Sequence, residues 1–438
     1  MYTSTSELQT ELSKVYDGNK VTDEHLLKSE IIDKLIFTAV FADDDELKKE
    51  SRKSIRGLAI ASGAVSSSIN NYYMAIGAKK VEPTSTVPAI NVRALTYDTA
   101  QIIFGLMIEK EVGPVIFEIA RSEIEYTEQR PDEYAVSVLA AAIKTDYKGP
   151  VFLQGDHFQF SQKKYADDPE SETNKIKALI EEALKADFKN IDIDASTLVD
   201  LTKPTQSEQQ EENYKVTSHL TTYIRSLEKD TTISIGAEIG HIGGKNSTPE
   251  ELVAFMDGYI EAVGDEKGIS KISVQTGTSH GGIPLPGGGM AQVNLDFGVI
   301  EKTGSVARNK YHIGGVVQHG ASTLPNDLFN QFPQHNTLEI HLATGFQNIV
   351  FDNIPEDLKN KIYAWLEENH QAEWDDKAEL DQNIYKTRKR AIGPFKKDLW
   401  SLSLEQKKPI VDNLRNQLSF LFDKLNISKT REDLLKHV

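Results

Sequence analysis

The sequence predicts an α/β protein, a closed (β/α)8 TIM barrel that carries helical extensions at both ends. Two observations support this fold class. From about residue 84 onward, short β-rich apolar runs alternate with longer amphipathic segments, and eight such units fit into about 270 residues. Alternation of this kind makes the strands parallel and joins them by right-handed crossovers, and eight units match the size of a closed barrel. A doubly wound sheet is the competing fold.

The predicted strands are short, and the segments between them place apolar residues at three- and four-residue spacing. That spacing is the period of an amphipathic helix. The runs YDTAQIIFGLMIEKE at 97–111 and TPEELVAFMDGYIEAVGD at 248–265 show it clearly. The eight candidate strands occupy residues 85–92, 113–120, 149–156, 188–195, 231–240, 268–277, 311–320 and 336–344.

The chain on either side of this region is predicted to be helical. Apolar residues recur at helical spacing up to Gly63, a residue type that suits a helix stop. We therefore divide the chain into an N-terminal helical extension at 1–83, a catalytic barrel at 84–353 and a C-terminal helical extension at 354–438. The extensions should pack around the barrel or form a subunit interface.

Composition excludes several classes of partner and chemistry. The chain has 438 residues, a formal net charge of −17 and no cysteine. An acidic protein repels nucleic acid and anionic membrane surfaces, so neither is an expected partner. Without cysteine, a site for a soft metal must use histidine and carboxylate. The N-terminus lacks the apolar segment of a signal peptide and no apolar run is long enough to cross a bilayer, so a cytoplasmic protein is expected.

Polar residues stand at the C-terminal ends of the predicted strands, where the chemistry of a TIM barrel is located. Four of the eleven histidines fall there, at His157, His280, His319 and His341. Neutral imidazoles that converge with a carboxylate suit Zn²⁺ or a similar divalent ion. A single such histidine is more often a hydrogen-bonded structural residue, but the set on the third, sixth and seventh strands favours a metal site.

Two carboxylates at strand ends each have two interpretations. Asp156 adjoins a candidate metal ligand, so it is either an acid/base group on a substrate hydroxyl or a carboxylate that orients a histidine. Glu238 either binds the metal or holds one of its ligands, or else it forms an ion pair with a lysine of the barrel. The residues by themselves leave both alternatives open.

Glycine-bearing loops follow the sixth, seventh and eighth strands, at 279–290, 319–325 and 343–348. Exposed N–H groups in such loops can hold a phosphate, and barrel phosphate sites commonly use the loops after strands seven and eight. A tight turn is the alternative for any one loop. The basic run KTRKR at 386–390 is either a solvated helix face or a group that reaches a substrate phosphate, in this chain or across a subunit boundary.

Together these motifs resemble the class II fructose-bisphosphate aldolase family, from about Pro88 to Asn353. Two of the matching segments, TGTSHGG at 276–282 and HGASTLP at 319–325, are the most specific. The resemblance implies a TIM barrel, a divalent metal and an aldol reaction that needs no lysine Schiff base. The matching segments are PAINV at 88–92, GDH at 155–157, GAEIGHIGG at 236–244, TGTSHGG at 276–282 and HGASTLP at 319–325.

The resemblance also implies a role for each matching residue. The implied catalytic residues are Asp156, at the position of the acid/base aspartate, and His341 in the eighth strand. The implied metal ligands are His157, His280, His319 and Glu238. The implied substrate- and phosphate-binding residues are Asn91, Ser196, Gly281, Gly320, Ser322 and Thr344.

Several positions depart from the family pattern. Lys245 and Asn246 stand where acidic residues usually follow the paired glycines of the fifth-strand loop. His341 replaces an asparagine that helps to hold the enolate. Ala120 replaces a serine at the end of the second strand, with Arg121 beside it as a substitute anion-binding group. These changes leave the metal ligands in place and alter the groups around the substrate.

The lead hypothesis is a zinc-dependent aldolase that cleaves or condenses a ketose phosphate, with fructose 1,6-bisphosphate first, through a metal-stabilised enediolate. The expected cofactor is Zn²⁺ or a similar divalent metal, with a monovalent cation as a further candidate. The expected partner is a small phosphorylated sugar, and we expect a homodimer or homotetramer. The alternatives are a sugar-phosphate epimerase on the same barrel and a noncatalytic aldolase-like subunit.

Overall fold

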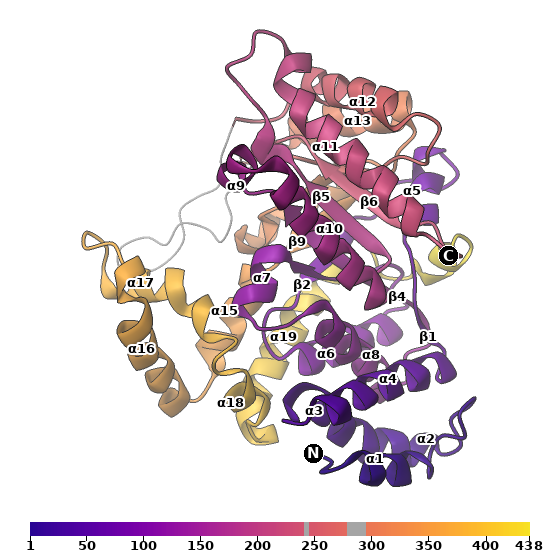
Figure 1. Cartoon of the computed structure of the whole chain (residues 1–438), viewed down its shortest axis with the longest axis vertical. Helices are drawn as coiled ribbons and strands as arrows, with labels where there is room; N and C mark the ends of the chain where they lie inside the picture. The colour runs from indigo at the N-terminus through magenta and orange to yellow at the C-terminus, as the bar shows by residue number, and fades with distance from the viewer. Residues whose placement is uncertain (241–244, 278–294) are drawn as a thin grey trace.

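The structure is a computed structural model of the chain, and it describes residues 1–240, 245–277 and 295–438. Within these ranges, eight parallel strands, β2 to β9, close into a barrel that a ring of helices surrounds (Figure 1). Strand β2 pairs with β3 on one side and with β9 on the other, and the pairing of β4 with β5 completes the circle. The predicted (β/α)8 barrel is confirmed, and the doubly wound alternative is wrong.

Each barrel strand coincides with a predicted apolar run, and β4 extends beyond its run. Every residue of β2, β3, β5 and β6 is buried, as expected for parallel strands that are covered by helices on the outside and packed on the inside. The barrel strands are β2 (Val87–Asn91), β3 (Ile116–Ala120), β4 (Gly149–Gln159), β5 (Asn190–Asp194), β6 (Ser234–Glu238), β7 (Lys271–Val274), β8 (Val316–Gln318) and β9 (Glu339–Leu342).

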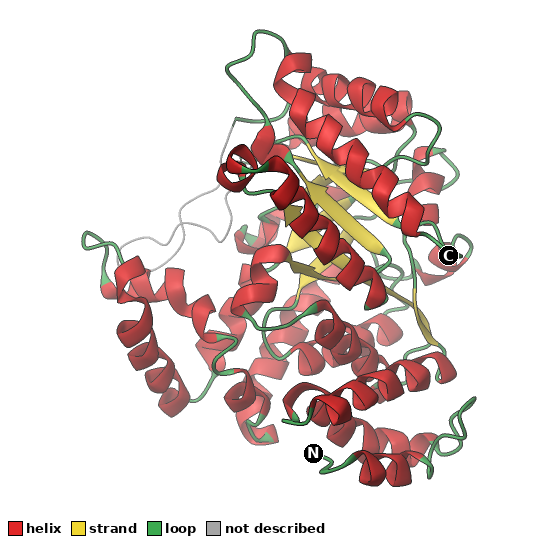
Figure 2. Cartoon of the chain, viewed as in Figure 1, coloured by secondary structure: helices red, strands yellow, loops and turns green. Residues whose placement is uncertain are grey.

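Helices follow the strands and cover the outside of the barrel (Figure 2). Some have strong start signals: the Thr248 side chain accepts a bond from the Glu251 N–H, and the Glu251 carboxylate accepts one from the Thr248 N–H. The elements between and after the strands are α6 (Thr96–Glu109), α7 (Arg121–Tyr126), α8 (Pro131–Lys144), α9 (Gln162–Asp167), α10 (Pro169–Lys185), η2 (Ser196–Leu198), α11 (Gln206–Leu227), α12 (Pro249–Val263), α13 (Phe297–Tyr311), η3 (Ala321–Thr323), η4 (Asn326–Leu328), α14 (Gln331–Gln334) and α15 (Thr344–Asn353).

The N-terminal region is helical as far as Gly63, which adopts a left-handed φ of 85° after the last turn of α4. The chain then forms a short strand, β1 (Ala64–Ser66), which pairs with the start of β4. The prediction of helix throughout this region is wrong there, because three extended residues leave no periodic signal. Helices α3 and α4 pack against α8. The remaining elements are α1 (Thr5–Leu12), α2 (Glu24–Leu26), η1 (Leu27–Ile31), α3 (Ile32–Phe41), α4 (Asp45–Ala61) and α5 (Asn70–Gly77).

Helix α5 packs against the N-terminal ends of the barrel strands. Its Tyr73 and Ile76 belong to one buried cluster with Val87 at the start of β2, Ile116 at the start of β3 and Leu338 just before β9. The hydroxyl of the fully buried Tyr73 donates a hydrogen bond to the carboxylate of Glu339 in β9. Helix α5 therefore forms part of the floor of the barrel, opposite the end at which the chemistry is expected.

In the C-terminal region, the long helix α19 packs against α6 and α15 on the outside of the barrel. It contains α16 (Glu356–His370), η5 (Gln371–Glu373), α17 (Leu380–Thr387), η6 (Arg388–Ala391), α18 (Lys396–Trp400), α19 (Leu404–Lys424) and α20 (Arg431–Leu435). Among the helices that the structure describes, none combines the length and the apolar character that spanning a bilayer requires.

Candidate metal centre and active site

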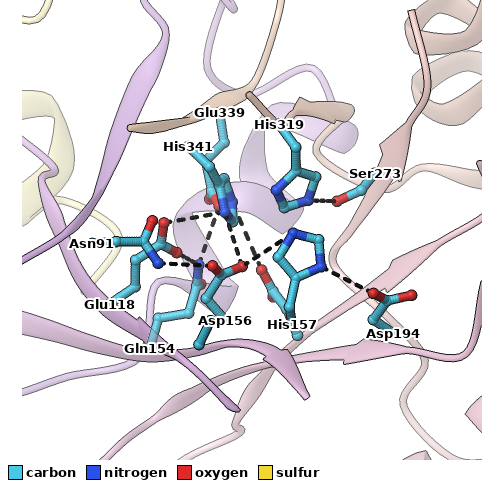
Figure 3. Close-up of polar contacts among 12 residues, drawn as sticks. Asn91, Glu118, Gln154, Asp156, His157, Asp194, Ser273, His319, Glu339 and His341 are labelled. Carbon is cyan, nitrogen blue, oxygen red and sulfur yellow. Dashed lines mark hydrogen bonds and ion pairs between the residues drawn. The ribbon is translucent and has the colours of Figure 1, made fainter. Parts of the chain in front are cut away.

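His157 lies on a distorted segment near the C-terminal end of β4. The register of β4 against β5 shifts between Gly155 and Phe158, and His157 has a left-handed φ of 40°. A non-glycine residue held in this region costs about 1–3 kcal/mol, and such residues are enriched at active sites. Gly155 permits the distortion, because a Cβ there would lie 2.4 Å from the Phe158 ring. The distorted strand points the His157 imidazole at His319 (Figure 3).

The imidazoles of three strand-end histidines meet at the C-terminal end of the barrel (Figure 3). The ring centroid of His319 lies 4.1 Å from that of His157 and 4.1 Å from that of His341. The structure thus brings together two of the histidines predicted as metal ligands, and adds the histidine predicted as catalytic. The other predicted ligand, His280, and the predicted phosphate-binding Gly281 lie outside the described residues.

Glu238, from the end of β6, stands between the two predicted ligands. Its Oε2 lies 3.3 Å from Nδ1 of His157 and 3.8 Å from Nε2 of His319. One ligand atom from each of these three residues lies within 4.8 Å of the other two. Ligand atoms that each lie about 2 Å from one Zn²⁺ ion are closer together than this, so the three side chains would move toward one another when an ion binds. Asp156, His319 and His341 form a second group of this kind, which shares His319.

The electrostatics of the cluster also fit a cation. Burial, together with the charge of Asp194, raises the pKa of Glu238 to about 7. Burial alone would lower the pKa of His157, but Asp156 and Glu238 raise it well above its ordinary value. Several buried carboxylates therefore compete for positive charge at this end of the barrel. Imidazole nitrogens and carboxylate oxygens are a donor set that suits Zn²⁺ and similar divalent ions, so the residues present fit such a metal.

Asp156 is buried and held from two sides. Its Oδ2 accepts a hydrogen bond of 2.8 Å from Nδ2 of Asn91, and its Oδ1 lies 3.1 Å from Nδ1 of His341. Although burial raises the pKa of this carboxyl, the imidazoles of His157 and His341 lower it well below the usual range. The geometry therefore presents an ionised carboxylate beside the metal ligands, with two neighbours that fix its orientation.

The barrel interior beneath His341 carries a charged network. Nε2 of His341 lies 2.7 Å from Oε1 of Glu339, and the same oxygen lies 2.5 Å from Nζ of Lys271. Lys271 also pairs with Asp192 at 2.9 Å and donates to Gln154 at 2.8 Å. The barrel lysine therefore pairs with Glu339 and Asp192 and not with Glu238, so that alternative for Glu238 is wrong. We missed this network, although charged residues inside fully buried strands were a visible signal.

A cavity of about 440 Å³ opens onto these groups, a size that suits a small ligand. Asp156, His157, His319 and His341 line one part of it. The predicted substrate- and phosphate-binding residues that line the same cavity are Asn91, Gly320, Ser322 and Thr344. Ser196 lies elsewhere: its hydroxyl donates to Asp194 at 2.7 Å, and it lines a neighbouring cavity of about 250 Å³.

Four basic side chains also line the cavity, together with the carboxylates of Glu123 and Glu125, and they are Arg93, Arg121, Lys164 and Lys389. Arg121, expected from the sequence as a substitute anion-binding group, lines the cavity, and its Nη1 donates to the Glu172 carboxylate at 2.6 Å and to the Gln159 carbonyl at 2.7 Å. Of the basic run, Arg388 is buried and bonds Asp352 and Asn348, so the interpretation of the run as a solvated face is wrong at that position. We did not predict Arg93 as a residue of this site. Its place two residues after Asn91, where β2 ends, was the signal that the sequence offered.

Comparison with known families decides the assignment. A family model described as fructose-bisphosphate aldolase class-II matches residues 75–397. The chain belongs to this family. The match includes the whole barrel, only the last three residues of α5, and the segment that carries Lys389. No curated protein matches the chain.

Solved structures resemble this class II aldolase family member at low sequence identity. The fructuronate-tagaturonate epimerase from Cohnella laeviribosi matches with a TM-score of 0.63 at 11% identity, over 90% of each chain. A probable tagatose 6 phosphate kinase from Sinorhizobium meliloti 1021 matches at 0.53 and 13% identity, over 81% of this chain and 100% of that one. The fructose-bisphosphate aldolase from Campylobacter jejuni matches at 0.49 and 19% identity, over 84% and 97%.

Two of the departures from the aldolase family pattern have a structural account. Lys245, in place of an acidic residue, forms an ion pair of 2.6 Å with Glu251 at the start of α12. His341, in place of asparagine, bridges Asp156 above it and Glu339 below it. The second change places an ionisable ring in contact with the candidate acid/base aspartate.

Proposed function

We propose that the protein is a zinc-dependent aldolase that cleaves or forms a carbon–carbon bond of a ketose phosphate. Fructose 1,6-bisphosphate is the first substrate to test. The observation that carries this proposal is the position of Asp156, oriented by Asn91 and His341, beside the group formed by His157, His319 and Glu238. Family membership supports the same class of reaction.

The proposed metal ligands are His157, His319 and Glu238, with His280 from outside the described residues. When bound, a divalent ion supplies Lewis acidity toward a ketose carbonyl. The left-handed backbone at His157 and the bond of its Nδ1 with Asp194 at 3.0 Å fix the ring before a ligand arrives. Outer partners of this kind commonly orient metal-binding histidines.

In the cleavage direction, one of the two carbons of the breaking bond carries a hydroxyl group, and Asp156 accepts the proton of that hydroxyl. That carbon becomes the aldehyde, and the bonding electron pair stays with the ketone fragment, which is later protonated. Asn91 and His341 hold the two oxygens of Asp156 during this transfer. Gly320, Ser322 and Thr344 are the proposed phosphate contacts, and Thr344 begins helix α15, whose N-terminus favours an anion.

The test is a coupled assay for triose phosphate release by zinc-loaded protein from fructose 1,6-bisphosphate and from its tagatose epimer. We expect release that a chelator stops and that added Zn²⁺ restores. Chelated protein serves as the blank, and Lys386→Ala serves as a matched variant, because Lys386 is exposed and does not line the cavity. No triose phosphate from either sugar at full metal loading would contradict the proposed reaction.

One observation favours a second candidate, a sugar-phosphate epimerase. His341 lies 3.1 Å from Asp156 and gives the site a second proton-transfer group. Two such groups allow the fragments of a cleaved ketose to recombine on the other face of the aldehyde, which inverts one carbon. A product with an unchanged carbon number, resolved by chromatography or NMR, would favour the epimerase over the aldolase.

A further inference from the structure

We propose that Glu118 is a positioning residue for Asp156, and that the two carboxylates share the Nδ1–H group of His341. The proposal rests on the proposed function, since Asp156 is the acid/base group of the proposed reaction. It deepens that function by giving a role to a residue outside the expected set. Glu118 comes from β3 and does not line the cavity of about 440 Å³.

His341 is held at both ring nitrogens (Figure 3). Its Nε2 lies 2.7 Å from Oε1 of Glu339, and its Nδ1 lies 3.1 Å from Oδ1 of Asp156. Carboxylate oxygens at both nitrogens make both of them donors. Oε1 of Glu118 lies 3.1 Å from the same Nδ1. One N–H group therefore has two carboxylates at the same distance, and one of them is the proposed acid/base group.

The oxygen of Glu118 next to this N–H group is buried and poorly bonded. The side chain is fully buried, and Oε1 accepts no well-aligned hydrogen bond from the described part of the chain. A buried acceptor in this condition costs free energy and calls for an explanation. A small turn of the His341 ring would move its Nδ1–H from Asp156 toward Glu118. The arrangement thus places a second acceptor within reach of one donor.

The other oxygen of Glu118 is anchored deeper in the barrel. Nε2 of Gln154 donates to Oε2 of Glu118 at 2.7 Å, and Oε1 of Gln154 accepts a hydrogen bond of 2.8 Å from Nζ of Lys271. Lys271 also pairs with Glu339. Two arms therefore run from one ammonium to the two nitrogens of His341, one through Glu339 and the other through Gln154 and Glu118. Glu118 cannot withdraw from the ring without breaking a buried hydrogen bond.

Stability alone does not account for a carboxylate at this position. Burial and the charge of Asp156 raise the pKa of Glu118 to about 8, and the contact with His341 opposes this rise. An apolar side chain of similar volume in place of a buried charge often leaves stability unchanged or raises it. Among the described residues of this network, four carboxylates stand against two cations, the carboxylates being Glu118, Asp156, Asp192 and Glu339 and the cations Lys271 and His341.

The shared N–H group gives Glu118 a task during the reaction. Asp156 becomes neutral when it accepts the substrate proton, and a neutral carboxyl accepts a hydrogen bond less strongly than a carboxylate. Its neutralisation also removes a charge that raises the pKa of Glu118, which favours the ionised form of Glu118. Glu118 then offers the Nδ1–H of His341 a carboxylate acceptor, so the ring keeps its place until Asp156 gives up the proton.

The first test is kinetic and compares zinc-loaded wild type, Glu118→Leu and Glu118→Gln on the ketose phosphate. Glu118→Leu should lower kcat about tenfold or more, as expected for the loss of one hydrogen bond to a charged group, and keep KM within about twofold. KM stays because Glu118 does not line the cavity. Glu118→Gln keeps an oxygen at this position and should recover a large part of the loss. An unchanged kcat in Glu118→Leu, or equal losses in both variants, would refute the proposal.

Stability measurements separate positioning from packing. Glu118→Leu should keep or raise the urea midpoint of the wild type while its kcat falls. Glu133→Gln is the matched control, because Glu133 is a buried carboxylate of α8 that pairs with Arg52 and Lys396 and does not line the cavity. It should lose stability at an unchanged kcat. A fall in stability that matches the fall in kcat of Glu118→Leu would make the residue merely structural. If Glu118→Leu does not fold, a wild-type kcat in Glu118→Gln would refute the role.

A double-mutant cycle tests the route through His341. In a His341→Asn background, Glu118→Leu should change kcat by less than about twofold, because the shared N–H group is no longer present. The same loss of kcat in both backgrounds would show that Glu118 does not act through His341, and the proposal would fail.

A further measurement needs no turnover, namely the exchange of the Nδ1–H of His341 with solvent, followed by NMR and assigned by its loss in His341→Asn. In the zinc-loaded protein, Glu118→Leu should speed this exchange about tenfold relative to wild type. Equal exchange in the two proteins would overturn the positioning role. A wild type that cleaves no ketose phosphate but shows the faster exchange in the variant would contradict the proposed reaction and leave the hold of Glu118 on His341 established.

Discussion

Replacing Lys271 by methionine removes the positive charge inside the barrel and keeps most of the side-chain volume. The ammonium is 1% exposed and pairs with Glu339, which is fully buried, at 2.5 Å, and with Asp192 at 2.9 Å. Lys271 and His341 hold the pKa of Glu339 at about 2, against the effect of burial. Without Lys271, His341 is the remaining cation near these carboxylates among the residues that the structure describes.

The expected cost follows from that geometry. Breaking a buried ion pair by removing one partner destabilises a protein by about 3–5 kcal/mol, because the other charge stays buried without compensation. The equilibrium between folded and unfolded chains should then shift by about a hundredfold to several thousandfold. Removing the Glu339 charge as well, in Lys271→Met/Glu339→Gln, should recover part of the loss, since Glu339 then needs no counterion while Asp192 still lacks its lysine.

The assay is urea unfolding followed by tryptophan fluorescence and circular dichroism, with wild type, both single variants and the double variant side by side. Agreement of the two probes supports a two-state analysis. The reasoning is refuted if Lys271→Met loses less than about 1 kcal/mol, or if the double variant is no more stable than Lys271→Met.

Three further predictions concern the metal, the acid/base group and the N-terminal region. His280→Ala should abolish both stoichiometric zinc binding, measured by atomic emission, and turnover; full activity would remove His280 from the ligand set. Asp156→Ala should keep the zinc and lose about 10²–10⁴-fold in kcat, and wild-type turnover would exclude it from the mechanism. Burial would raise the pKa of Asp132, but Arg56 and Arg52 lower it below its unfolded value near 3.8. The ionised Asp132 therefore stabilises the folded protein above that unfolded value. This contribution is lost as the pH falls through the lower pKa of the folded state. Asp132→Asn should cost about 1 kcal/mol or less at pH 7, with the difference from wild type shrinking below pH 4; a difference that grew at acid pH would contradict this.

The barrel could be predicted from the sequence because its strands are buried on both faces. Runs such as 113–120 and 188–195 are then apolar enough to stand out between amphipathic helices. The strand β1 could not be found in this way, because Ala64–Ser66 is too short for any period. Its extended form depends on pairing with the start of β4, a contact between segments far apart in the chain.

The candidate site was predictable where strand geometry alone decides it. The C-terminal ends of all strands meet at one end of a barrel, so His157 and His319 had to be neighbours once the strands were placed. The left-handed backbone at His157 was not predictable, since it depends on the Phe158 ring packing over Gly155. Lys389 was assigned only to a basic run, because its approach to the cavity depends on how the C-terminal helices dock.

The floor of the barrel and its catalytic end are joined by one hydrogen-bonded column, from Tyr73 through Glu339 and His341 to Asp156. Engineering that refills the axis of the barrel with aliphatic side chains would sever the column. Variation at Tyr73, far from any substrate, should therefore be felt by the proton-transfer group. A library aimed at new substrates would do well to include α5 alongside the loops.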